Sequence, residues 1–268
     1  MAKRSLRPLI PAERRQGWRW ALLGVLLGGL VTLTLSAPAR WLAQLLRVQT
    51  QGHLLILNPR GTVWNGSGNV VFASGVGGAD AISLPGVVGW RLRPDWRGLS
   101  AQLDLSCCTS TPMGVKIRPG ADGIHLQLVD GSSRWPAGLL TGFGAPFNTL
   151  RLEGVLDLST QNLSLAFRGR TLSFDGRATL DATDISSSLS TLRPMGSYRV
   201  VLDGGNASSM IVTTRDGSLR LSGTGRWNGQ AMRFSGEASA APGREDALSN
   251  LLNIIGRRDG ARSIITLG

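Results

Sequence analysis

Leu219-Arg-Leu-Ser-Gly-Thr-Gly-Arg-Trp227 and Met232-Arg-Phe-Ser-Gly-Glu-Ala-Ser-Ala240 are the stretches that decide the fold. Both follow one order: apolar, any residue, apolar, polar, glycine, three further residues, apolar. Because successive side chains of a strand point to opposite faces, such a segment has one apolar face and one polar face. Two earlier segments, Leu150–Leu158 and Leu172–Leu180, repeat the order. The central glycines of the four are Gly154, Gly176, Gly223 and Gly236.

A glycine in the middle of an apolar strand face removes packing volume and permits local bending. This suits a strongly curved sheet that folds over its own apolar side. Two architectures satisfy the pattern: an ordinary sandwich with glycine bends, and a half-pipe that holds lipid. The apolar residues that would line the trough of a half-pipe include Leu152, Leu156, Phe174, Leu221 and Phe234.

Short strands separated by turn signals continue through most of the chain. The 268 residues include 36 glycines but only 1 tyrosine and 6 phenylalanines, a composition typical of β-folds with many turns. The sequence predicts an all-β fold: a curved, mainly antiparallel sheet or sandwich of about a dozen strands. Outside the repeats, strands are expected at 54–57, 68–73, 99–105, 114–118, 124–129, 163–167, 198–202 and 210–213.

Less regular segments interrupt and end this pattern. Gly131–Asn148 is rich in glycine and proline and predicts a long connection with a short helical turn, and residues 185–195 predict a second connector. Near the end, Glu245–Ile255 has the pattern of an amphipathic helix, with Gly256 placed to stop it. Residues 263–267 offer a last strand.

The N-terminal region predicts a membrane anchor. Residues 20–39 carry no charge, and twenty helical residues span about 30 Å, the thickness of a hydrocarbon core. Trp18, Trp20 and Trp41 stand where interfacial indoles are favoured. The prediction is a basic tail at 1–19, a transmembrane helix at 20–39 and a β-rich domain at 40–268, which opens with an amphipathic helix at 40–48.

Charge predicts the orientation of this anchor. The basic residues of the tail are Lys3, Arg4, Arg7, Arg14, Arg15 and Arg19, against Glu13 alone. Such a cluster stays on the cytoplasmic side, so we expect a single-pass protein of a bacterial inner membrane with its bulk in the periplasm. A cleaved signal peptide is the alternative, because Ala37-Pro38-Ala39 has the form of a processing site. The long charged lead and Trp41 favour a retained helix.

Composition and motifs argue against several classes of function. The net charge is +12, but beyond the tail the excess of basic residues is spread thinly, which argues against nucleic acid as a partner. His53 and His125 are far apart, and no triad, phosphate loop or metal spacing occurs. We therefore expect no enzyme, no catalytic residue, no metal and no cofactor. Cys107 and Cys108 are adjacent and could close only a strained ring, so free or alternatively paired thiols are expected.

Leu57-Asn-Pro-Arg-Gly-Thr-Val-Trp-Asn-Gly-Ser-Gly68 is the most distinctive segment of the chain. Asn65-Gly66 is also a strong signal for a two-residue hairpin turn. The segment resembles the signature of the type II secretion system protein N family, with Gly61, Thr62, Trp64, Asn65 and Gly66 as the signature residues. Further likenesses cover nearly the whole chain: Pro38–Trp41, the spacing of Trp90, Leu92 and Pro94, Gly-Ser-Tyr at Tyr198, and the C-terminal helix and strand.

The resemblance implies an accessory inner-membrane component of the machinery that exports folded proteins across the outer membrane. It implies protein–protein contacts with other secretion-system proteins, through strand edges, the Trp64 region or the transmembrane helix, and no catalysis. The repeats also resemble AsmA-like envelope proteins with curved sheets. The alternative function is therefore a lipid-binding or lipid-shuttling envelope module, with lipid as the further candidate partner.

Overall fold

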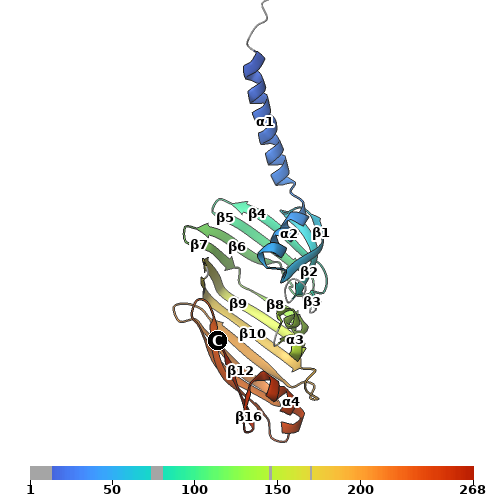
Figure 1. The fold of residues 1–268 in the computed structure, drawn as a ribbon, viewed down its shortest axis with the longest axis vertical. Helices are drawn as coiled ribbons and strands as arrows, with labels where there is room; N and C mark the ends of the chain where they lie inside the picture. The colour runs from blue at the N-terminus through green and yellow to red at the C-terminus, as the bar shows by residue number, and fades with distance from the viewer. Residues whose placement is uncertain (1–13, 74–80, 145–146, 170) are drawn as a thin grey trace, which may run out of the picture.

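The protein is described by a computed structural model that covers residues 14–73, 81–144, 147–169 and 171–268. Helix α1 (Arg14–Leu35) stands clear of the rest of the protein. Helix α2 (Ala39–Gln49) follows it and lies at the end of a large sheet that is nearest to α1 (Figure 1). Within α1, Trp18–Leu35 is long and apolar enough to cross a membrane. The helix ends at Leu35 rather than at Ala39, because the next residues lie against the sheet. Of the predicted basic tail, residues 1–13 lie outside the described residues.

The described strands form one antiparallel sheet of 16 strands, so the curved sheet and not the sandwich is the architecture. Its order is β1-β2-β4-β5-β6-β7-β9-β10-β11-β12-β13-β14-β16-β15, with β3 beside β2 and β8 beside β9. The first strands are β1 (Leu54–Gly61), β2 (Asn65–Ala73), β3 (Ala81–Ser83), β4 (Val88–Asp95), β5 (Gly98–Leu105), β6 (Met113–Gly120), β7 (Gly123–Leu128) and β8 (Gly131–Pro136). The later strands are β9 (Glu153–Arg168), β10 (Thr171–Ser186), β11 (Gly196–Asp203), β12 (Ser209–Gly217), β13 (Leu219–Trp227), β14 (Met232–Ala240), β15 (Arg257–Asp259) and β16 (Arg262–Leu267).

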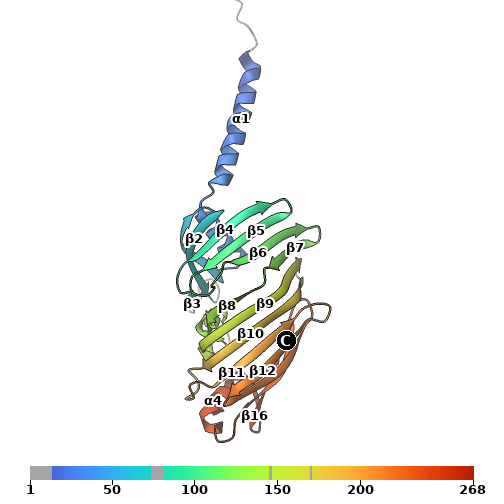
Figure 2. The same cartoon turned by 180° about the vertical axis from the view of Figure 1, so that it is seen from behind.

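The helices gather on one face of this sheet. The helices α2, α3 (Phe147–Leu150) and α4 (Glu245–Ile255) lie in front of the strands in Figure 1, and the strands lie in front in Figure 2. A short 3-10 helix, η1 (Ala137–Phe143), precedes α3. Amphipathic helices bury their apolar stripe, so the face that they cover holds the core.

Hydrogen bonds across the sheet show how strongly it curves. The hairpin of β11 and β12 is short, and the tip of the next hairpin reaches past it to β10. The Nε1 of Trp227 donates to the carbonyl oxygen of Leu172 at 2.5 Å, and the backbone N of Leu172 donates to the carbonyl oxygen of Gly229 at 2.9 Å. Strands that are separated by two others in the sheet order therefore meet at one end.

Two separate apolar cores lie under the helices. The larger joins β9, β10, β11, β13 and β14 to α4, and its largest fully buried side chains are Met195, Leu248, Leu251 and Leu252. The smaller joins β4 and β5 to η1 and contains Leu84, Val88, Leu105, Cys108 and Leu139. The second half of the chain thus builds the more complete core.

The structure confirms most predicted elements and corrects some. Strands β13 and β14 and helix α4 have the predicted bounds. The predicted strands 150–158 and 163–167 are one long strand, β9, because Asn162 takes a positive φ of 49° at a bulge and the chain does not turn back there. Strands β3, β4, β8 and β15 were not predicted, and β8 replaces the first part of the expected connection 131–148.

Candidate functional site

The signature residues form the turn between β1 and β2. Gly61 pairs with Gly66 across this hairpin, and residues 62–64 make the turn. The prediction of a two-residue turn at Asn65-Gly66 is wrong, since both residues open β2. Thr62 closes the turn instead: its backbone N donates to the carbonyl oxygen of Asn65 at 2.9 Å, and its hydroxyl accepts from the N of Asn65 at 3.0 Å.

Trp64 links this turn to α1. Its indole Nε1 donates to the carbonyl oxygen of Thr34, in the last turn of the helix, at 2.7 Å. The last carbonyls of a helix have no partner within the helix, and an indole nitrogen is only a donor. Trp64 therefore acts as a hydrogen-bonding cap on the end of the apolar helix.

The segment after α1 makes a second attachment to the same turn. The backbone N of Val63 donates to the carbonyl oxygen of Ala37 at 2.8 Å, and Pro38 forms an isolated bridge with Thr62. Ala39 is only 1% exposed. The Ala-Pro-Ala sequence is therefore part of the folded junction between helix and sheet, which we name the anchor junction: residues 34–39 with 61–66.

Trp90 of β4 supports the anchor junction from within the sheet. Its indole Nε1 lies 3.2 Å from the carbonyl oxygen of Thr62 and 3.0 Å from that of Val63, and the residue is 4% exposed. A Cβ on Gly66 would lie 2.6 Å from the Trp90 ring, so only glycine leaves room for it. The two motifs that carry the resemblance, at Trp64 and at Trp90, thus meet in space.

The four repeat glycines serve two different purposes. Gly154 and Gly176 have φ of 130° and 90°, which side chains rarely adopt, and each lies at a register shift between β9 and β10. Gly223 and Gly236 pair directly across β13 and β14. A Cβ on either would lie within 3 Å of the Phe234 ring, so these glycines make space for that ring.

The predicted trough residues divide between the two ends of the strands. Leu156 is buried, and Leu152 and Leu221 pack against the same core beneath the helices. Phe174 and Phe234 lie toward the opposite ends of β10 and β14, and each is half-buried. The helix-covered end of the apolar face is therefore filled by the protein itself.

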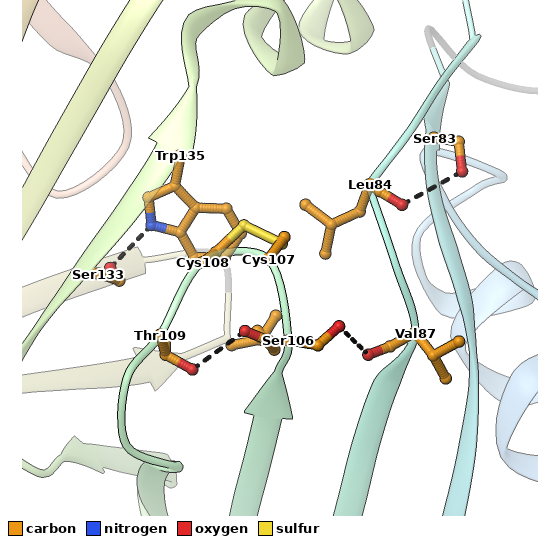
Figure 3. Close-up of a disulfide and its surroundings, with 10 residues drawn as sticks. Ser83, Leu84, Val87, Ser106, Cys107, Cys108, Thr109, Ser133 and Trp135 are labelled. Carbon is orange, nitrogen blue, oxygen red and sulfur yellow. Dashed lines mark hydrogen bonds between the residues drawn. A yellow bond between two sulfur atoms is a disulfide. The ribbon is translucent and has the colours of Figure 1, made fainter.

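Cys107 and Cys108 form a disulfide with each other, so the expectation of free or alternatively paired thiols is wrong. They lie in the turn after β5, where the backbone N atoms of Cys108 and Thr109 both donate to the carbonyl oxygen of Leu105. In a strand neighbouring side chains point apart, whereas this turn lets them meet. Cys108 is buried in the smaller core, near Trp135 (Figure 3).

The ionisable side chains form surface pairs on the polar face of the sheet. Hydrogen bonds from Arg199 hold the pKa of Asp181 below its usual value, with Arg215 adding to the effect. Hydrogen bonds from Arg168, then from His125, lower the pKa of Asp122 to about 2. The sequence around His125 indicates no triad or metal site, and in the structure its Nε2 lies 3.1 Å from Oδ1 of Asp122 in the turn at 121–122. Among the described residues no cluster of three His, Cys, Asp or Glu side chains could hold a metal ion.

Comparison with known proteins identifies one family. The model of the family described as Type II secretion system (T2SS), protein N, matches residues 53–265. The match covers the signature turn, the motif at Trp90 and all four repeat glycines. No curated protein and no solved structure matches the chain.

Proposed function

We propose, from the premise that the chain belongs to the type II secretion system protein N family, that it is an accessory inner-membrane component of the secretion machinery. It acts through protein–protein contacts in the export of folded proteins across the outer membrane. The observation that carries this proposal is the family match over residues 53–265, which places the chain in a secretion accessory family. It uses no catalytic residue and no cofactor.

The anchor junction supports a retained membrane helix with the bulk of the chain in the periplasm. Cleavage after Ala39 would cut a residue that is 1% exposed and remove the partner of Trp64. The excess of basic residues at the start of the chain, on the N-terminal side of the apolar span, favours a cytoplasmic N-terminus. In this arrangement the chain has a cytoplasmic tail, a membrane helix, and a periplasmic domain that hydrogen bonds fix to the end of the helix.

The signature turn is the surface that we propose meets another secretion-system protein. All three residues of edge strand β15 are exposed, but they are Arg257, Arg258 and Asp259, and charges on an edge discourage strand pairing. Asn65, at the exposed side of the signature turn, lies beside the end of α1, where a partner can contact the helix and the domain together.

Three measurements test this function. A reporter active only in the periplasm should be active when fused after Gly268 and inactive when fused before Ala21. The intact mass of the purified protein should include residues 1–40, and a mature N-terminus at Arg40 would contradict the retained anchor.

The third measurement addresses the partners. A photoreactive p-benzoylphenylalanine at Asn65 should cross-link another secretion component, whereas one at Asn228, an exposed asparagine in the distant turn between β13 and β14, should not. Equal cross-linking from both positions, or none from Asn65, would contradict the proposed contact surface.

A lipid-binding or lipid-shuttling module is the second candidate function. The observation that favours it is an apolar part of the sheet face that no helix covers. The two functions are compatible in one chain, since the anchor junction and the uncovered face are different surfaces.

A further inference from the structure

One continuous row of apolar side chains crosses five neighbouring strands on the inner face of the sheet. The backbone register pairs Leu99 with Ile117, Ile117 with Leu126, Leu126 with Leu165, and Leu165 with Phe174. Cross-strand partners lie on the same face. We name this row the apolar lane. It runs from β5 to β10 and so joins the two halves of the molecule.

The row beside it on the opposite face is polar throughout. Its members are the next residues along the same strands: Ser100, Lys116, Gln127, Ser164 and Asp175, paired with one another in the same order. In these two rows, all five strands place an apolar residue on one face of the sheet and a polar residue on the other. Such alternation is expected where one face meets water and the other meets an apolar phase.

The described residues cover the apolar lane only in part. Every one of its five residues is only half-buried, and the next pair toward the strand ends, Ile124 and Phe167, is 51% and 41% exposed. The helices α2, α3 and α4 lie near the other ends of the strands. The lane thus presents an uninterrupted apolar surface to the surroundings.

A cavity of about 280 Å³ adjoins the lane where β8 departs from β7. Apolar side chains supply most of its wall: Leu103, Leu105, Met113, Leu128, Trp135 and Leu158. Leu128 connects it to the lane, because it lies two residues beyond Leu126 on the same face of β7 and pairs with Val115. The cavity is therefore continuous with the apolar lane through Leu128.

We propose that this surface binds the acyl chains of a phospholipid from the membrane that α1 spans, with a chain along the apolar lane and its end in the cavity. The proposal rests on the proposed function in one respect, that α1 crosses the membrane beside the sheet. The lipid-binding function thereby acquires a site and a ligand class: a glycerophospholipid held by its hydrocarbon.

The backbone of the lane favours hydrocarbon over a polypeptide. A peptide that binds a sheet usually pairs with a free strand edge. Strands β5, β6, β7, β9 and β10 each have a hydrogen-bonded neighbour on both sides, so the lane offers side chains only. An acyl chain has no hydrogen bonds to satisfy and gains binding free energy with each methylene that it buries.

The end of the sheet nearest to the helix suits a membrane surface. Strands β4 and β5 lie close to α1 in both views (Figures 1 and 2). In the turn between them Trp96 is 81% exposed, and the guanidinium carbon of Arg97 lies 3.9 Å from the centre of its ring. Tryptophan is favoured at bilayer interfaces, and arginine is attracted to anionic lipid headgroups. The lane therefore begins in this hairpin itself, at Leu99, two residues after Arg97.

Photo-cross-linking in living cells tests the site, using the full chain and cells grown with radioactive phosphate. Probes of p-benzoylphenylalanine are placed at Leu128 and Leu165 on the apolar face, and at Gln127 and Ser164 on the polar face. We expect phosphate label on the protein from the first pair and background label from the second. Each control lies on the same strand as its probe, one residue away, and differs from it in the face of the sheet on which it lies.

A substitution in the lane sharpens the test. Leu126→Arg should reduce the label captured at Leu165 about tenfold or more, because arginine is strongly unfavourable against hydrocarbon. Gln127→Arg, one residue away on the polar face, should leave it unchanged within about twofold. Circular dichroism and the melting temperature of both variants would show that the sheet is still folded.

Three outcomes overturn the proposal: equal label from both faces, no label from either apolar position, or capture of a polypeptide at Leu128. The reporter fusions and the Asn65 cross-link are measured in the same cells. If those succeed while lipid label fails, the lipid site is wrong and the anchored secretion function stands. If the fusions fail, the membrane premise is wrong as well.

Discussion

The two halves of the sheet differ in how far their apolar face is covered by other parts of the protein. In β9–β16 most of the face is covered by α4 and by the connector after β10, and Leu248, Leu251 and Leu252 are almost completely buried, whereas Leu165 and Phe174 at the other strand ends stay half-buried. In β4–β7 the smaller core reaches only one end of the strands, and Leu99, Ile117 and Leu126 are left half-exposed. The same alternating sequence pattern therefore produces a stable core in one half and an open surface in the other. What differs is the presence of a covering segment.

The largest expected effect comes from truncating the covered core. Leu251→Ala should destabilise the protein by about 2 to 5 kcal/mol, because it leaves a cavity under α4. Leu126→Ala, the same change in the open half, should cost below about 1.5 kcal/mol, since its side chain already meets solvent. Denaturant unfolding of the purified chain measures both. Equal costs would mean that the open half is covered in solution.

Overpacking the glycine pair should have the next largest effect. Gly223→Leu places a side chain against the Phe234 ring and should cost about 1 to 3 kcal/mol. Thr224→Leu, on the polar face of the same strand, should change the free energy of unfolding only mildly. Strand preference for leucine is the same at both positions, so a difference between the two variants reports packing. The unfolding midpoint compares them. A small, equal shift would show that Phe234 moves freely aside, and loss of bound lipid without loss of stability would place lipid at this pair.

Weakening the anchor junction should have a smaller and more local effect. Trp64→Phe removes the donor to Thr34 but keeps an aromatic ring, a loss of about 0.5 to 1.5 kcal/mol for one hydrogen bond. The Val63 amide, which donates to Ala37, should then exchange roughly threefold to tenfold faster with deuterium. Trp96→Phe, in an exposed turn, should leave that amide unchanged. An unchanged Val63 amide in both variants would indicate that Trp64 does not hold the helix end.

The smallest expected effect is on acid stability. The pKa of Asp181 is lowered in the folded protein by Arg199, so its stabilisation is present above the unfolded pKa of about 3.9 and is lost as the pH falls through the lower folded value. Asp181→Asn should cost less than about 1 kcal/mol at neutral pH and flatten the loss of stability below pH ~4. Asp122→Asn, at an exposed pair in the open half, should change the pH dependence of the unfolding free energy less. A steeper loss of unfolding free energy with falling pH in Asp181→Asn would contradict a lowered pKa of Asp181 in the folded protein.

Parts of this architecture could be predicted from sequence because their causes are local. Leu219–Trp227 and Met232–Ala240 alternate without interruption, and Glu245–Ile255 carries its own stop at Gly256, so their bounds were predicted correctly. The family signature was visible because its residues are contiguous. What the signature does was not visible, since its partners Thr34 and Trp90 are about 30 residues away on either side.

Other features depend on contacts that no local pattern encodes. Strand β4 contains Pro94, which argues against a strand, but β2 pairs only with residues 88–91 of β4, so no hydrogen bond is required from that position. The disulfide depends on the turn after β5. The apolar lane emerges only when the register places Leu99, Ile117, Leu126, Leu165 and Phe174 side by side.

Hydrogen–deuterium exchange of the full chain in detergent micelles tests the central comparison most directly. If a covered half and an open half share one sheet, the slowest amides should lie in β9–β14, and those of β5–β7 should exchange at least about tenfold faster, through local opening. Adding phospholipid should slow exchange in β5–β7 and leave β11–β14 unchanged. Equal protection of the two halves without lipid, or slower exchange in β5–β7 than in β11–β14, would contradict the account.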